Sequence, residues 1–127
     1  MYVRYMDDFI LIGNSKAELW NSLADIKWLL DTKLKLQLNK KTKVYKSSKG
    51  IDFAGYRTWS THIRPRKRNI VAARRRFKKM SLKYAHGEIG LDYIGPRVVS
   101  FIGYMKHCSG KTTTEATLRH LVLRMEN

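Results

Sequence analysis

The sequence predicts an α+β fold, in which a small antiparallel sheet with one packing helix is followed by a bundle of about three helices. Short runs of β-branched and aromatic residues, separated by turn residues, dominate the first half. Apolar residues at three- and four-residue spacing dominate the second half. The change falls near residues 64–68, so we expect one subdomain over residues 1–65 and a helical one over residues 66–127.

Composition limits the classes of function. The 127 residues include 26 Lys and Arg against 10 Asp and Glu, which gives a formal net charge of +16. Self-repulsion of this size is tolerated where a polyanion is the partner, which favours nucleic acid over an anionic membrane surface. No apolar run reaches the roughly 20 residues of a membrane span, and the single cysteine, Cys108, excludes an internal disulfide. We expect a soluble, intracellular protein without a membrane partner.

The first predicted element is a β-hairpin with two carboxylates at its tip. Asp7 and Asp8 lie between apolar runs at residues 2–4 and 9–12. Neighbouring side chains point to opposite sides in a hairpin, so Asp7 and Asp8 cannot both face the same partner equally. We therefore expect one carboxylate to be the main contact at a site and the other to support it. Adjacent carboxylates repel unless a cation compensates them, and oxygen ligands suit Mg²⁺ or Mn²⁺. Aspartates are also common in turns for structural reasons, so that alternative stays open.

One helix and several strands complete the first predicted subdomain. Ser15 and Glu18 form a capping-box signature, and a helix with one apolar face follows them. Residues 40–42 are expected to form a turn, and Pro65 is expected to end the extended structure. Gly55 indicates a bulge or a close backbone approach within its strand. Strands are predicted at residues 34–39, 43–47, 51–59 and 63–64.

The second predicted subdomain contains three helices. The first, a basic amphipathic helix, has apolar residues at helical spacing over residues 70–84, with Arg and Lys on its other faces. The second is expected to begin at the Gly-Pro pair of residues 95–96, because proline suits the first position of a helix. Thr112 and Glu115 form a capping-box signature for the third, whose apolar side continues to Met125.

These features, in this order, resemble the second half of a prokaryotic reverse transcriptase palm followed by its thumb. Residues 5–8, Tyr-Met-Asp-Asp, resemble motif C, residues 38–42 resemble motif D, and residues 50–56 resemble motif E, the primer grip. Group II intron, retron and diversity-generating retroelement enzymes are the most similar branch, and residues 57–68 look most like the last of these. The resemblance implies a bacterial, cytoplasmic RNA-directed DNA polymerase. Such a nucleotidyltransferase uses an RNA template, a DNA or RNA primer, dNTPs and two Mg²⁺ or Mn²⁺ ions.

The resemblance also implies roles for individual residues. Asp7 is the expected principal metal ligand and Asp8 the supporting carboxylate, and both are catalytic. Lys41, or else Lys40, would donate a proton to the pyrophosphate leaving group, although a solvated turn lysine is an equal alternative. Ordinary core packing of the aromatic residues and a solvated charge run are competing explanations for the others. The residues implied to contact nucleic acid are Tyr5, Met6, Phe53, Gly55, Tyr56, Arg74, Arg75, Arg76, Lys78 and Lys79.

One departure from the family pattern bears on activity. Two-metal nucleotidyl transfer needs carboxylates from two separate strands, and the family takes the other aspartate from motif A, upstream of motif C. Because Met1 lies almost at the hairpin, we expect an excised piece or a truncated gene product that does not polymerise in isolation. Its partner would be the missing fingers and palm portion of the same polypeptide. The alternative function is a non-catalytic, basic RNA-binding module similar to an intron maturase.

Overall fold

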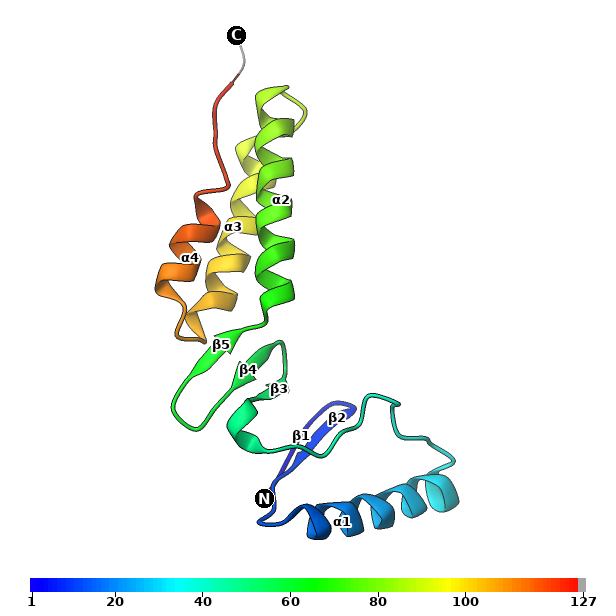
Figure 1. Ribbon diagram of the computed structural model, residues 1–127. Helices are drawn as coiled ribbons and strands as arrows, with labels where there is room; N and C mark the ends of the chain where they lie inside the picture. Colours follow the sequence, from blue (N-terminus) through cyan, green and yellow to red (C-terminus); the bar gives the residue numbers. More distant parts are fainter. Residues whose placement is uncertain (126–127) are drawn as a thin grey trace. The chain divides into compact units, whose positions relative to one another are not determined.

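The computed structural model describes residues 1–125 and has an α+β fold, as predicted (Figure 1). These residues form one two-stranded and one three-stranded antiparallel sheet together with four α-helices. Two compact units, Met1–Lys49 and Gly50–Asn127, divide the chain. The predicted boundary after residue 65 lies inside the second unit, where strands give way to helices. Residues 126–127, the end of the predicted helical subdomain, lie outside the described residues.

The first unit opens with the predicted hairpin. Strand β1 (Tyr2–Tyr5) pairs antiparallel with β2 (Asp8–Leu11), and Tyr5 lies directly opposite Asp8. Backbone hydrogen bonds of 2.8 Å run in both directions between residues 1 and 12 and close the open end of the hairpin. The turn therefore falls at the two residues between the strands, where the sequence predicts it.

Helix α1 (Lys16–Leu29) begins at the predicted cap. The Ser15 hydroxyl accepts a hydrogen bond from the backbone N–H of Glu18 at 3.1 Å. The apolar face of α1 is half-buried at best, because no residue from 1 to 49 has a buried side chain. Trp20 and Trp28 are 54% and 60% exposed. The first unit thus has secondary structure without a sealed core of its own.

Two predicted strands of this unit, residues 34–39 and 43–47, are wrong. Helix α1 continues as a five-residue π-helix (Leu30–Leu34), and residues 35–46 form no strand. The backbone N–H of Leu36 bonds to the carbonyl of Leu30 at 3.0 Å, so the polar groups of this segment close a wide helical turn. Alternating leucines describe a side-chain pattern, but a strand also needs a neighbouring strand to pair with.

The second unit begins with a three-stranded sheet in the order β3–β4–β5. Its strands are β3 (Ile51–Phe53), β4 (Tyr56–Thr58) and β5 (Ile63–Pro65). The single strand predicted over residues 51–59 is wrong, because Ala54 and Gly55 have φ values of 45° and 90° and reverse the chain. Two successive residues with positive φ are typical of the tight turn that joins antiparallel strands.

Three helices form the rest of the unit: α2 (Lys67–Ala85), α3 (Leu91–Lys106) and α4 (Lys111–Leu118) (Figure 1). Phe77 of α2 is 1% exposed and meets Phe101 of α3 edge to face, with ring centres 5.3 Å apart. The predicted basic amphipathic helix is therefore confirmed. No described helix has the length and apolar character that crossing a membrane requires. The buried core consists of Ile70, Ala73, Phe77, Met80, Ile94, Phe101 and Met105.

The predicted starts of α3 and α4 are wrong. Helix α3 begins after Gly90 and includes Pro96 in its second turn, where proline removes one backbone hydrogen bond and its ring crowds the carbonyl four residues earlier. Helix α4 follows Gly110 without a side-chain cap, so Thr112 lies inside the helix. It ends at Leu118, so the predicted apolar side up to Met125 is not helical.

Replacing Gly50 with alanine is expected to destabilise the second unit. Gly50 is buried with φ 75°, and an added Cβ would lie 2.5 Å from the indole ring of Trp59. Positive φ and overpacking together predict a loss of about 2 kcal/mol or more in the free energy of unfolding, measured in urea. Gly103→Ala is the control, because no atom lies within 4 Å of its added Cβ. Equal effects of the two substitutions would contradict this account of Gly50.

Candidate functional site

The tip of the β1–β2 hairpin carries the two predicted metal ligands. Met6 and Asp7 form the turn, and Met6 has φ 51°, a left-handed conformation that is rare for residues other than glycine. The Arg4 Nε–H donates to the Met6 carbonyl oxygen at 2.9 Å and holds this turn. Asp7 and Asp8 are both exposed. A strained, braced turn therefore presents two carboxylates to solvent.

The two carboxylates come from different parts of the hairpin. Asp8 begins β2 and shares a face of the hairpin with Tyr5, its directly opposite partner. Asp7 belongs to the turn. Within residues 1–125, no three or more His, Cys, Asp or Glu side chains are grouped to hold a metal ion. Two exposed carboxylates suit a partial site for Mg²⁺, which binds through one or two carboxylates together with waters and substrate phosphates.

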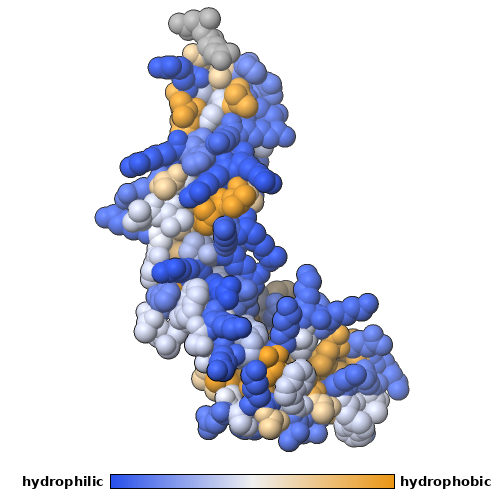
Figure 2. Space-filling view, in the orientation of Figure 1, coloured by the Kyte–Doolittle hydropathy of each residue, from blue (hydrophilic) through white to orange (hydrophobic). Residues whose placement is uncertain are grey.

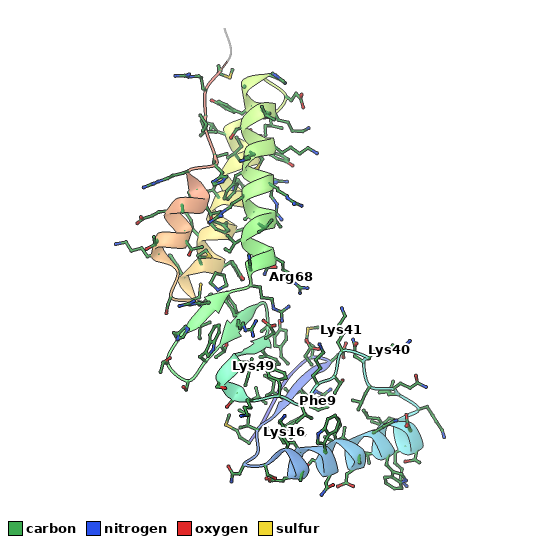
Figure 3. The ribbon with its side chains drawn as sticks, in the orientation of Figure 1. Phe9, Lys16, Lys40, Lys41, Lys49 and Arg68 are labelled. Carbon is green, nitrogen blue, oxygen red and sulfur yellow. The ribbon has the colours of Figure 1, made fainter. Side chains whose placement is uncertain are left out.

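Lys40 and Lys41 lie on the predicted turn at residues 40–42, which is confirmed (Figure 3). The side-chain oxygen of Asn39 accepts from the Lys41 backbone N–H at 3.0 Å, and the Asn39 carbonyl accepts from the Thr42 N–H at 2.9 Å. Both lysine side chains are exposed. This geometry fixes the turn backbone and leaves proton donation by Lys41 a prediction.

The predicted primer-grip residues are tied to helix α3. The Tyr104 hydroxyl donates to the Gly55 carbonyl oxygen at 2.7 Å and accepts from the Asn69 side-chain amide at 3.1 Å. The Tyr56 hydroxyl donates to the Tyr104 carbonyl oxygen at 2.8 Å, and the two rings stack 4.8 Å apart. Burial, followed by the neighbouring Tyr104 and Cys108, raises the pKa of Tyr56. Tyr56 therefore has a structural role, whereas contact of Phe53, Gly55 and Tyr56 with a primer stays a prediction.

The basic residues of α2 differ in their exposure to solvent. Arg75, Arg76, Lys78 and Lys79 are exposed, as a phosphate-binding face requires. Arg74 is half-buried, and its Nε–H donates at 3.4 Å to the hydroxyl of Thr117, a fully buried residue of α4. The Nε–H of Arg74 is thus engaged inside the helical bundle, and its predicted contact with nucleic acid stays a prediction.

The sequence prediction missed Arg68, an exposed residue in the first turn of α2 (Figure 3). Arg68 lies seven residues before Arg75, and Lys79 lies four residues after it, so the three share one side of the helix. Hydrophilic side chains also cover much of the visible surface over the helices (Figure 2). The signal that could have identified Arg68 in the sequence is its helical spacing from Arg75.

Comparison with protein-family models, with curated proteins and with solved structures finds no match to this chain.

Substituting Tyr104 with phenylalanine is expected to loosen the β3–β4 turn from the helices. The change removes a hydroxyl that bonds both Gly55 and Asn69, and leaves these partly buried groups only the longer 3.4 Å hydrogen bond between the Asn69 amide and the Gly55 carbonyl. We expect the free energy of unfolding in urea to fall by about 1–3 kcal/mol. Tyr93→Phe, at an exposed position of the same helix, is the control. Equal stability of the two variants would show that the Tyr104 hydroxyl does not fasten the turn.

Proposed function

We propose that this chain is the part of an RNA-directed DNA polymerase that carries the metal-binding hairpin, the primer grip and a basic thumb. The observation that supports this most is the register of the hairpin, which puts Asp7 in the turn and Asp8 at the first position of β2. A pair of exposed carboxylates on such a tip is accessible to metal-bound phosphates. The proposed partners are an RNA template, a DNA or RNA primer and dNTPs.

Asp7 and Asp8 would hold divalent ions in this proposal. When bound, such ions neutralise charge on the reacting phosphate and on the attacking and leaving oxygens. The hairpin contributes position, because the braced turn fixes where its two carboxylates project. Waters, substrate phosphates and a carboxylate from the fingers and palm portion of the same polypeptide would supply the remaining ligands.

The first unit has apolar surface that a further palm segment would cover in this proposal. No side chain of residues 1–49 is buried. A hollow of about 640 Å³ beside α1 includes Trp20, Leu23 and Leu38 among its lining residues. Apolar surface of this kind is stabilised when another part of a protein removes it from water. A unit that completes its core with additional palm residues fits these observations.

The exposed basic side of α2 would contact the phosphates of the template–primer duplex. From Arg68 to Lys79 it extends over about 16 Å of helix, at 1.5 Å per residue. Arg75 lies between them on the same side. Cations on a rigid helix bind phosphate oxygens without reading sequence, which suits an enzyme that must copy any template.

A non-catalytic RNA-binding module is the second candidate. It uses the same basic side of α2 and is favoured by the exposure of Arg68, Arg75 and Lys79 there, which needs no metal at the hairpin. The two functions differ at Asp7 and Asp8. Metal binding there supports the polymerase proposal, while RNA binding that is indifferent to these carboxylates supports the alternative.

Manganese should bind the chain at the hairpin tip. Added to isotope-labelled protein, paramagnetic Mn²⁺ is expected to broaden the amide NMR signals of residues 5–9 before others, since two exposed carboxylates are adjacent there. Replacing Asp7 and Asp8 together by asparagine should abolish this preference. The matched control replaces Asp25 and Asp31, which are exposed carboxylates of the same unit. Preferential broadening that survives without Asp7 and Asp8 would contradict the metal assignment.

Substitutions on the basic side of α2 should weaken duplex binding in a salt-dependent way. For Arg75→Ala with Lys79→Ala, we expect the slope of log affinity against log salt to fall by about two units, one for each lost phosphate contact. Fluorescence anisotropy with a labelled RNA–DNA duplex measures this slope. Lys16→Ala with Lys27→Ala removes the same charge from exposed positions of the first unit. An unchanged slope in the α2 variant would exclude this side of the helix as the contact surface.

A further inference from the structure

The three-stranded sheet has two chemically different faces. Directly opposite residues of antiparallel strands share a face, and every second residue along a strand returns to it. Arg57 lies opposite both Asp52 and Arg64, while Trp59 lies opposite His62, with a backbone hydrogen bond of 2.9 Å between them. We call these five residues the Arg–Trp face. Asp52, Arg57 and Arg64 are exposed, and Trp59 and His62 are half-buried.

Tyr104 of helix α3 packs against the opposite face of the sheet. Tyr56, which alternates with Arg57 along β4, stacks on Tyr104 of α3 and bonds to its carbonyl. Ile51, Phe53 and Thr58 belong to the same covered face and are half-buried. Contacts on the covered face therefore attach the sheet to the helical bundle. The aromatic and charged side chains of the Arg–Trp face lie on the other side of the sheet, so their presence needs another explanation.

The aromatic centre of the Arg–Trp face is held in place by its neighbours. The His62 ring stacks on Trp59 with centres 4.6 Å apart and an angle of 15° between the planes. Gly50 packs so closely on the indole that a Cβ would overlap it. The guanidinium groups of Arg57 and Arg64 lie 5.6 Å and 5.8 Å from the indole centre. Two cations thus flank a pre-ordered pair of aromatic rings.

A hollow of about 470 Å³ adjoins these rings. Residues 58–63, which include the β4–β5 loop with Trp59 and His62, line one part of it, and residues 106–109, at the C-terminal end of α3 and just beyond it, line the rest. Its size falls in the range of sites that bind small organic groups, roughly 300–1,000 Å³. Lys106 contributes an exposed cation to the rim. Aromatic rings and Lys106 therefore border one space of suitable size for a base, and Arg57 and Arg64 lie beside the indole that lines it.

The charge balance of this region favours an anion. Arg57, Arg64 and Lys106 contribute three cations, while Asp52 is the one carboxylate of the face and lies 3.6 Å from Arg66. Stacked aromatic rings recognise planar groups, and arginines bind phosphates. An unpaired nucleotide offers both, whereas a duplex keeps the faces of its bases stacked inside.

We propose that the Arg–Trp face and its hollow bind unpaired nucleotides of a single-stranded nucleic acid. The base occupies the hollow against the Trp59–His62 pair, and Arg57 and Arg64 contact the adjoining phosphates. This surface is separate from the basic side of α2 assigned to duplex. The proposal does not use Asp7 or Asp8, so it stands or falls independently of the metal-binding hairpin.

Trp59 fluorescence tests the proposal in the full chain. Trp20→Phe with Trp28→Phe leaves Trp59 as the single tryptophan, and both replaced residues are more than half exposed. Oligo-U and oligo-dT should each quench Trp59 emission saturably, because a stacked base quenches the indole. A blunt duplex at equal phosphate concentration should not. The two single strands also distinguish RNA from DNA as the preferred source of the nucleotide.

Charge substitutions test whether Arg57 and Arg64 contribute to the binding of single strands. Arg57→Ala with Arg64→Ala should lower the affinity for single strands about tenfold or more and reduce the salt slope by about 1.4 units, at 0.7 per phosphate. Lys16→Ala with Lys27→Ala removes the same charge from exposed positions of the first unit and should change this affinity less than about threefold. Circular dichroism checks folding. Arg64→Gln, at one exposed side chain, gives the same comparison if the double variant unfolds.

Three results would overturn the proposal. One is Trp59 emission that stays unchanged when single strands saturate the protein. Another is an equal loss of single-strand affinity in the two charge variants, which would indicate attraction by overall charge. The third is binding to vesicles of anionic phospholipid that depends on Arg57 and Arg64 while oligonucleotides leave Trp59 unquenched. That outcome would assign the face to a membrane surface.

Discussion

The register of the first hairpin is the constraint on which the functional interpretation depends. Pairing of Tyr5 with Asp8 places the turn at Met6 and Asp7, and the reciprocal bonds between residues 1 and 12 fix that register from the other end. A slip by one residue would move each side chain of a strand to the opposite face. The Arg4 bond to the turn carbonyl further stabilises a left-handed conformation at Met6. Backbone pairing thus determines where the two carboxylates project.

The two units differ in how they are stabilised. The second has a buried core centred on Phe77, and its sheet is fastened to α3 by the Tyr56 and Tyr104 hydroxyls. The first unit has no buried side chain among residues 1–49 and depends on hairpin pairing, a helix cap and local turns. Because burial of apolar surface is the main stabilising contribution to folding, the first unit gains most from a partner. The proposed palm portion would provide that partner.

The sequence pattern correctly predicted the elements that are stabilised by interactions between residues close together in the sequence. The cap at Ser15, the turn after Asn39 and the amphipathic spacing of α2 all involve residues within a few positions of one another. Strand predictions failed where pairing decides the outcome, at residues 34–39 and 43–47. The strand predicted over residues 51–59 failed because positive φ at Ala54 and Gly55 reverses the chain.

The candidate site follows the same rule. The carboxylate pair was predictable because its two members are adjacent in a turn, but the engagement of Arg74 was not, because Thr117 lies 43 residues away. The Arg–Trp face required the register of β4 and β5, which brings Arg57 opposite Arg64. Interactions between distant parts of the chain decide which charged residues remain available to a ligand.

The most direct measurement is cDNA synthesis by a complete polymerase that contains this hairpin, compared between the original protein and an Asp7→Asn variant. The account predicts that synthesis is abolished while binding to the RNA template is retained, because the substitution removes a metal ligand and leaves the basic surfaces intact. Synthesis at the original rate by the Asp7→Asn enzyme would contradict the assignment of this turn as half of a metal site.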